Sequence, residues 1–217
     1  GIYYSRGHRP QPVPFRTYLV PAVFRALRQS RHPIDMKNLL LISALIWAGI
    51  THAQPYTPVD ASSSISFKIK NFGSTVDGRF SGLSGSIFFD ESNVSAASFQ
   101  VTVESKTIDT GIGLRDSHLR KKDYFAVSEH ATIRFASSSV TLAKPGSGTV
   151  TGRLTIKKTT KEISVPFTYV LSGNTIRFKG EFALNRRDFG VGGGSISLAD
   201  EVKVFLEVTA IRSEQRG

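Results

Sequence analysis

Cysteine is absent from this chain of 217 residues, and histidine is rare. Without cysteine the chain has no disulfide, no thiolate nucleophile and no cysteine-ligated metal site. Only His118 and His130 follow residue 53, and neither belongs to a motif with metal-ligand spacing. A serine nucleophile elbow and a pair of neighbouring carboxylates are also missing. We therefore expect no catalytic residues, no metal and no cofactor other than a bound ligand.

Long apolar runs are scarce, and the run Leu39–Ile50 is too short to cross a bilayer as a helix. It follows Met36 and a lysine, and it precedes a Thr-His-Ala sequence with small residues at the cleavage positions. Residues 36–53 thus have the three parts of a signal peptide. A buried core helix is the alternative, but the run lacks the polar face of such a helix. We expect a periplasmic or secreted protein.

Acidic residues are missing from the start of the chain, where residues 1–35 contain six arginines and no acid before Asp35. Such a segment is either a basic tail for nucleic acid or a membrane surface, or upstream sequence that is not in the mature protein. We favour the second interpretation and expect a disordered, non-native extension. Residues 1–53 hold seven of the 28 Lys and Arg and one of the 17 acids, or +6 of the net charge of +11. The remaining +5 is weak support for polyanionic partners.

From residue 61 onward, apolar and polar residues alternate, as in Ile65, Phe67 and Ile69 with serine and lysine between them. A period of two is typical of a half-buried β-strand. Eight segments show it, separated by turn residues: 64–70, 85–90, 98–104, 131–137, 149–157, 162–171, 175–184 and 201–210. We predict one all-β domain over residues 54–217, a sandwich or a barrel. Eight antiparallel strands can close into a barrel, which removes exposed edges.

The inward faces of these strands are rich in phenylalanine, with Phe99 and Val101 on one strand and Phe178 and Phe182 on another. Large flat side chains either pack the interior solid or line an apolar slot, and an eight-stranded barrel has room for one small ligand. Both possibilities remain open at this point. Because the aromatic residues alternate inward, they do not suit a sheet that binds nucleic acid, and we expect no such partner.

The segment Leu114–Phe125 is the one plausible helix, and we expect it to cross one mouth of the barrel. Asp116 is placed to cap its first turn, and basic residues follow, as the helix dipole favours. His118 and Asp116 would make a proton-transfer pair, but a spacing of two residues points them to different helix faces. We favour a structural cap in which Leu119 and Phe125 close the barrel over a ligand.

Two charged clusters lie outside the alternating pattern. One contains Arg115, and the other begins at Arg186 and continues into a glycine-rich loop. A buried arginine requires a matching acid, for which Asp109, Asp116 and Asp188 are the candidates. The alternative is a solvated ion pair worth under about 1 kcal/mol.

Several motifs in combination resemble the YceI-like family. They are the segments 108–110, 115–119, 123–125 and 133–135, and the sequences VDGRFSGLSGSIFFD, VTGRLTIKKTTKEISVPF and NRRDFGV. The resemblance spans about residues 56–211 and implies an extended, lipocalin-like antiparallel barrel. It also implies periplasmic or secreted placement and a polyisoprenoid or similar amphipathic lipid in an apolar tunnel. The family's motif positions correspond to Arg115, Asp116, His118, Leu119, Phe125, Arg186, Asp188 and Phe189.

We predict a binding protein that sequesters or carries a polyisoprenoid or isoprenoid quinone-like lipid, with transient membrane contact and a homodimer as further expectations. The expected tunnel lining is Ile65, Phe67, Ile69, Phe99, Val101, Leu119, Phe125, Phe135, Phe178, Phe182 and Phe189. The expected polar residues at the mouth are Arg115, Asp116, His118, Arg186 and Asp188. One alternative is an enzyme or enzyme accessory of isoprenoid or stress metabolism that uses His118 and the mouth arginines. Another is a solid-cored interaction barrel.

Overall fold

The computed structural model of the chain describes residues 54–212. The predicted N-terminal extension and signal peptide, residues 1–53, lie outside the described residues. In the described part, no helix is both long and apolar enough to pass through a membrane.

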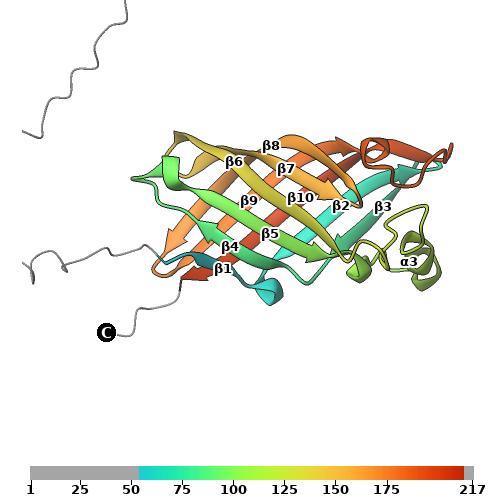
Figure 1. Ribbon diagram of the computed structural model, residues 1–217, viewed down its shortest axis with the longest axis horizontal. Helices are drawn as coiled ribbons and strands as arrows, with labels where there is room; N and C mark the ends of the chain where they lie inside the picture. Colours follow the sequence, from blue (N-terminus) through green and yellow to red (C-terminus); the bar gives the residue numbers. More distant parts are fainter. Residues whose placement is uncertain (1–53, 213–217) are drawn as a thin grey trace, which may run out of the picture. The chain divides into compact units, whose positions relative to one another are not determined.

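Ten antiparallel strands and one α-helix make up the described domain (Figure 1). The strands are β1 (Tyr56–Pro58), β2 (Ser64–Asn71), β3 (Ser74–Phe80), β4 (Ser84–Phe88), β5 (Ser98–Glu104), β6 (Thr132–Lys144), β7 (Ser147–Ile156), β8 (Thr159–Ser172), β9 (Thr175–Asn185) and β10 (Leu198–Arg212). The helix is α3 (Gly113–Leu119), and the 3-10 segments are η1 (Asp60–Ser62), η2 (Val94–Ala96), η3 (Ser105–Thr107) and η4 (Arg186–Phe189). All eight predicted strands are present.

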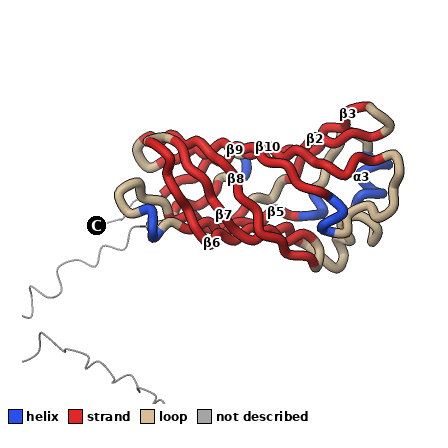
Figure 2. The backbone as a smooth tube through the Cα atoms, turned by 90° about the horizontal axis from the view of Figure 1, so that it is seen from above, coloured by secondary structure: helices blue, strands red, loops and turns tan. Residues whose placement is uncertain are grey.

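Eight of the strands close a barrel. The order runs from β1 through β4, β5, β6, β7, β8 and β9 to β10, and β10 then pairs with β1 to complete the ring. All of these pairings are antiparallel. The predicted eight-stranded antiparallel barrel is therefore confirmed, and its long strands give it the elongated form in Figure 2.

Strands β2 and β3 extend the barrel beyond the ring. The long strand β10 pairs with β1 at its C-terminal end and with β2 along its N-terminal part, so β1 and β2 are two halves of one interrupted strand. In the same way, β3 pairs with β2 and β4 pairs with β1. The interruption is held by Asp60, whose carboxylate accepts hydrogen bonds from the N–H groups of Gly82 and Leu83 at 3.0 and 2.8 Å.

Strands β1 and β3 are not among the strands predicted from the sequence. Strand β1 has only three residues and ends at Pro58, which is too short to show an alternating pattern. In β3, Gly78 stands on the face where Val76 and Phe80 would continue the apolar series. Its missing side chain hides the period of two from a search for apolar residues.

Aromatic side chains pack against one another toward one end of the barrel. Five aromatic residues from β5, β8, β9 and the end of β4 meet there with ring centroids 4.8 to 6.4 Å apart: Phe89, Phe99, Phe167, Tyr169 and Phe178. They belong to the larger buried cluster, which lies toward the β8–β9 turn. A smaller cluster of Leu154, Ile156, Phe189 and Val191 lies toward the other end, which carries the β7–β8 turn and α3. The two ends of the barrel therefore differ in packing.

A bulge in β6 bends the barrel wall opposite Gly152 of β7. The register of the two strands shifts between Ser137 and Ser139, and Gly152 pairs with Ser137. A Cβ atom on Gly152 would lie 2.5 Å from the carbonyl oxygen of Ala136 and 2.7 Å from the Cα atom of Ser137. Both of these neighbours are backbone atoms, so the wall itself would have to move.

We expect Gly152→Ala to lower the free energy of unfolding by about 1–3 kcal/mol, because overpacking against backbone is relieved only by moving strands. Urea unfolding followed by circular dichroism measures this change. Gly113→Ala is the matched control: no atom lies within 4 Å of its added Cβ, and alanine favours the helix by up to about 1 kcal/mol. Equal stabilities of the two variants would contradict the close approach at Gly152.

Candidate ligand-binding cavity

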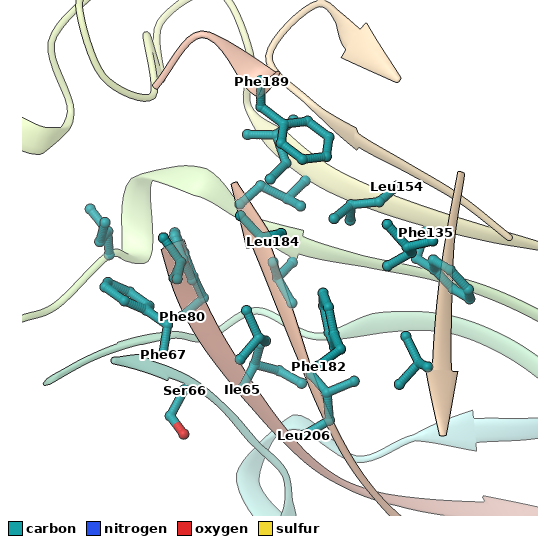
Figure 3. Close-up of a pocket in the computed structure, with 18 of the residues that line it drawn as sticks. Ile65, Ser66, Phe67, Phe80, Phe135, Leu154, Phe182, Leu184, Phe189 and Leu206 are labelled. Carbon is teal, nitrogen blue, oxygen red and sulfur yellow. The ribbon is translucent and has the colours of Figure 1, made fainter. Parts of the chain in front are cut away.

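A cavity of about 280 Å³ occupies the interior of the barrel (Figure 3). Every strand except β1 contributes side chains to its lining, together with α3, η4 and the segment after α3. The volume lies just under the roughly 300 Å³ at which small-molecule pockets begin. Most of the lining side chains are aliphatic or aromatic. The cavity therefore suits one narrow apolar group.

All the apolar residues proposed from the sequence lie around this cavity. They are Ile65, Phe67, Ile69, Phe99, Val101, Leu119, Phe125, Phe135, Phe178, Phe182 and Phe189. The strand residues among them reach it because alternate side chains of a strand share one face. That they contact a ligand stays a prediction. The proposal missed other lining residues, including Phe80, Ile163, Tyr124 and Leu206. The alternating pattern of their strands could have identified Ile163 and Leu206 as inward-facing. Phe80 could not be identified in this way, because Gly78 interrupts the alternation of its strand.

The ring of Phe67 lies across Gly78 of the neighbouring strand. The two residues are directly opposed in the β2–β3 pair. A Cβ atom on Gly78 would lie 2.2 Å from Cζ of the Phe67 ring, a distance that no real contact allows. Phe67 then meets Phe80 at a centroid distance of 5.7 Å, and Phe80 meets Phe125 edge-on at 5.4 Å. The absent side chain of Gly78 thus lets an aromatic ring lie on the wall.

Phe135 is placed in the same way over Gly152. A Cβ atom on this glycine would lie 2.7 Å from Cζ of the Phe135 ring. Phe135 therefore lines the cavity without closing it. Because two large rings lie on the wall, the middle of the barrel stays open although its lining is aromatic. The solid-cored alternative describes only the end that is packed by the aromatic cluster.

Polar groups line the cavity toward α3. Arg115 lines it, and its Nε and Nη2 atoms donate to Oγ1 and the carbonyl oxygen of Thr110, each at 2.7 Å. Asn71 also lines the cavity, and its side-chain oxygen is buried without a hydrogen-bond partner. This end therefore offers a guanidinium donor and an amide acceptor beside an apolar interior.

The buried Asp116 holds the loop that precedes α3. Its carboxylate accepts hydrogen bonds from the N–H and the hydroxyl of Thr110, at 2.9 and 2.5 Å. The helix begins at Gly113 with Ile112 as its N-cap and has no side-chain cap. The expectation that Asp116 caps the helix is therefore wrong: the carboxylate binds backbone before the helix instead. His118 is exposed, packs edge-on against Tyr124 at 4.9 Å, and does not line the cavity.

Arg186 is the centre of a buried hydrogen-bond network. Its side chain is 2% exposed, and it lines the cavity. It donates at 2.9–3.3 Å to five carbonyl oxygens, those of Val191, Gly193, Ser195, Leu198 and Ala199. These bonds tie the glycine-rich loop between η4 and β10 to the end of β9.

The acid that pairs with Arg186 is Asp200, at 3.1 Å. The three candidates from the sequence are wrong: Asp116 binds Thr110, Asp109 pairs with Arg79 at 2.6 Å, and Asp188 is exposed and does not line the cavity. Asp200 follows the glycine-rich loop, and only the folding of that loop brings it back to Arg186. No local sequence pattern shows how that loop folds, so Asp200 could not be identified from the sequence.

Asp109 anchors the segment before α3 to the barrel wall. The N–H of Gly111 and the guanidinium of Arg79 both donate to its carboxylate and lower the pKa of Asp109 below its ordinary value. Backbone bonds between Arg79 and Asp109, at 2.9 and 3.1 Å, add an isolated β-bridge. The segment before α3 thus continues the pairing of β3.

No group of three or more His, Cys, Asp or Glu residues could hold a metal ion within residues 54–212. His118 and Asp116 do not form a pair, since one is exposed and the other is buried against Thr110. Within these residues, the site is an apolar cavity with polar groups, such as those of Arg115 and Asn71, at one end.

Residues 56–210 match the YceI-like domain family. A UPF0312 protein of Pseudomonas aeruginosa is 35% identical over 184 residues, which cover 80% of this chain and 95% of that protein. The crystal structure of BcnA from Burkholderia cenocepacia is similar, with a TM-score of 0.67 and 29% identity over 70% of this chain and 99% of BcnA. A polyisoprenoid binding domain from Saccharophagus degradans shares the fold, with a TM-score of 0.62 and 16% identity over 74% of this chain and 99% of that domain.

We expect Arg186→Met to lower the free energy of unfolding by about 3 kcal/mol, because buried carbonyl groups would lose a charged donor. Arg187→Met is the matched control. Arg187 also bonds to Asp200, but it is 48% exposed, so we expect a loss below about 1 kcal/mol. Urea unfolding of both variants measures the difference. If both variants lose less than about 1 kcal/mol, the Arg186 network does not hold the loop.

Proposed function

The chain belongs to the YceI-like family, and from this premise we propose that it is a carrier that binds a polyisoprenoid or isoprenoid quinone-like lipid in the barrel cavity. The observation that carries the proposal is the narrow apolar cavity, whose aromatic lining lies against the wall. The fold shared with a domain described as polyisoprenoid binding supports the same class of ligand.

The asymmetry of the cavity supports one orientation of the lipid. The buried aromatic cluster occupies the interior toward the β8–β9 end. Arg115 and the unpartnered oxygen of Asn71 lie toward the α3 end, where a hydroxyl or phosphate head group would find a donor and an acceptor. The lipid would therefore enter tail first and keep its polar end near α3.

Apolar burial alone gives such a ligand useful affinity. Each buried CH₂-sized unit contributes about 0.8 kcal/mol, so ten units contribute roughly 8 kcal/mol before ordering costs. A micromolar dissociation constant corresponds to a net value of about 8 kcal/mol, so further buried units must offset the ordering costs. Binding and release of a lipid need no catalytic group. We propose that the protein acts as a carrier in the periplasm or outside the cell, in line with the signal-peptide pattern of residues 36–53.

The enzyme alternative has less support from the geometry. It would use His118, which is exposed, packs against Tyr124 and does not line the cavity. The nearby acid Asp116 accepts two hydrogen bonds from Thr110 and is not free to move a proton. Arg115 and Arg186 do line the cavity, but each is hydrogen-bonded to backbone carbonyl groups. A binding function uses the apolar lining, for which the enzyme alternative has no role.

Protein purified without detergent from the cells that produce it should carry a lipid. We expect native mass spectrometry to show a bound species with one lipid per chain, and tandem mass spectrometry of the solvent extract to identify a prenyl chain. Protein recovered only without ligand, which then also fails to bind added prenyl alcohols or quinones, would contradict the proposal.

Gly78→Ala should weaken lipid binding without unfolding the protein. The added methyl group would meet the far end of the Phe67 side chain, and the ring would turn away from the wall into the cavity. We expect about a tenfold rise in the dissociation constant, or about 1.4 kcal/mol, with little change in unfolding free energy. Titration with a fluorescent prenyl lipid measures the affinity.

Gly113→Ala, which adds a methyl group in open space, is the control for the titration. Unchanged affinity in Gly78→Ala would mean that the position of the Phe67 ring does not govern the cavity.

A further inference from the structure

The most exposed large apolar side chains of the described residues lie together at the α3 end. Phe72 is 85% exposed, Leu114 is 85% exposed, and Ile196 is fully exposed. The next is Val170, at 67%, on the face of β8 toward the opposite end. Single exposed apolar residues are ordinary on protein surfaces. Here, however, three such residues lie around the same end of the cavity, two on loops and one at the start of α3. A group of this kind marks an interaction surface.

The segments that carry these three side chains form one connected rim. We define the mouth rim as residues 71–74, 111–125, 157–158 and 186–200. Its parts are joined by hydrogen bonds: Phe72 N to the Ser197 carbonyl at 2.9 Å, Gly192 N to the Asp123 carbonyl at 2.8 Å, and Lys157 Nζ to the Lys122 and Gly190 carbonyls at 3.2 and 2.8 Å. Figures 1 and 2 both place α3 and the β2–β3 turn at this end. The apolar tips therefore belong to one surface.

Phe72 keeps a strained backbone at its exposed position. Its φ angle is +48°, in the left-handed region that bulky residues rarely adopt. Gly73, the other residue of this two-residue turn, also has a positive φ, at +79°, so the β2–β3 hairpin requires the left-handed backbone at both positions. Asparagine would adopt that backbone more readily, yet the turn has a phenylalanine whose side chain contributes nothing to the core.

The mouth rim also holds most of the net positive charge of the described domain, although it has fewer than half of the Lys and Arg residues. It contains eight Lys and Arg and four Asp, a net of +4. All of residues 54–212 contain 20 Lys and Arg and 15 Asp and Glu, a net of +5. Lys121, Lys122 and Lys158 are exposed among the apolar tips. Apolar side chains interspersed with lysines are typical of surfaces that bind anionic bilayers.

We infer that the mouth rim docks on the surface of a lipid bilayer with anionic head groups, and that Phe72, Leu114 and Ile196 enter the head-group region. The purpose of this docking rests on the proposed carrier function: at this end, a lipid could pass between the bilayer and the cavity without crossing water. The charge complementarity and the exposed tips support docking independently of the cargo. None of the three tips lines the cavity.

Flotation with phospholipid vesicles tests the inference. The intact protein should float with vesicles that contain about 30% phosphatidylglycerol, less with pure phosphatidylcholine, and less again as salt rises, because salt screens the lysines. The triple variant Phe72→Asn, Leu114→Gln, Ile196→Gln should bind at least about tenfold more weakly. Asparagine is chosen at position 72 because it accepts a positive φ. Val170→Gln, an exposed apolar position toward the other end, is the control and should bind as the parent does.

Circular dichroism must show the triple variant folded, and native mass spectrometry must show whether its lipid content equals that of the parent. Equal lipid content with lost flotation supports docking at the rim. Equal flotation of parent and triple variant, or no flotation of the parent, overturns the inference and leaves the carrier function intact. If the parent protein floats with vesicles but never contains a prenyl lipid, the docking inference stands and the proposed carrier function is rejected. If the parent instead sediments as a dimer that the triple variant loses, a second copy covers the rim, and bilayer docking is rejected.

Discussion

The hollow interior depends on the close contact between aromatic rings and glycines of the barrel wall. Phe67 lies across Gly78, and Phe135 lies against Gly152, so each ring takes up space that a side chain of the wall would otherwise fill. A side chain at either glycine would push the ring inward and fill the space. Apolar atoms that face a void lose the dispersion contacts of a packed core. An apolar ligand would restore those contacts, which is the physical reason to expect one.

The same barrel treats its two ends differently. Toward the β8–β9 end, aromatic rings such as those of Phe89 and Phe178 pack edge to face. At the α3 end, loops replace strands, and hydrogen bonds from Arg186 hold the glycine-rich loop in place. The fixed loop borders the apolar cavity at this end, as the position of Arg186 in the lining shows. The polar groups of Arg115 and Thr110 then mark where an amphipathic ligand changes from apolar to polar.

Sequence reasoning was reliable where a local period carried the information. Alternation placed the eight strands and the inward face, because side-chain direction in a strand depends only on parity. It failed where the course of a loop decides: the partner of Arg186 proved to be Asp200, and Asp116 binds the loop before its helix. The sequence alone does not show whether the aromatic side chains fill the interior or line a cavity. The answer depends on strand pairing, which places Gly78 opposite Phe67.

The central claim is that the middle of the barrel is apolar, dry and open. Crystals of lipid-stripped protein under xenon pressure test it most directly, because xenon enters dry apolar cavities. The account predicts ordered xenon between Phe67, Phe135 and Phe182, with the two rings still lying on Gly78 and Gly152. An interior with no xenon, in which the rings have turned from the wall and filled the space, would contradict it.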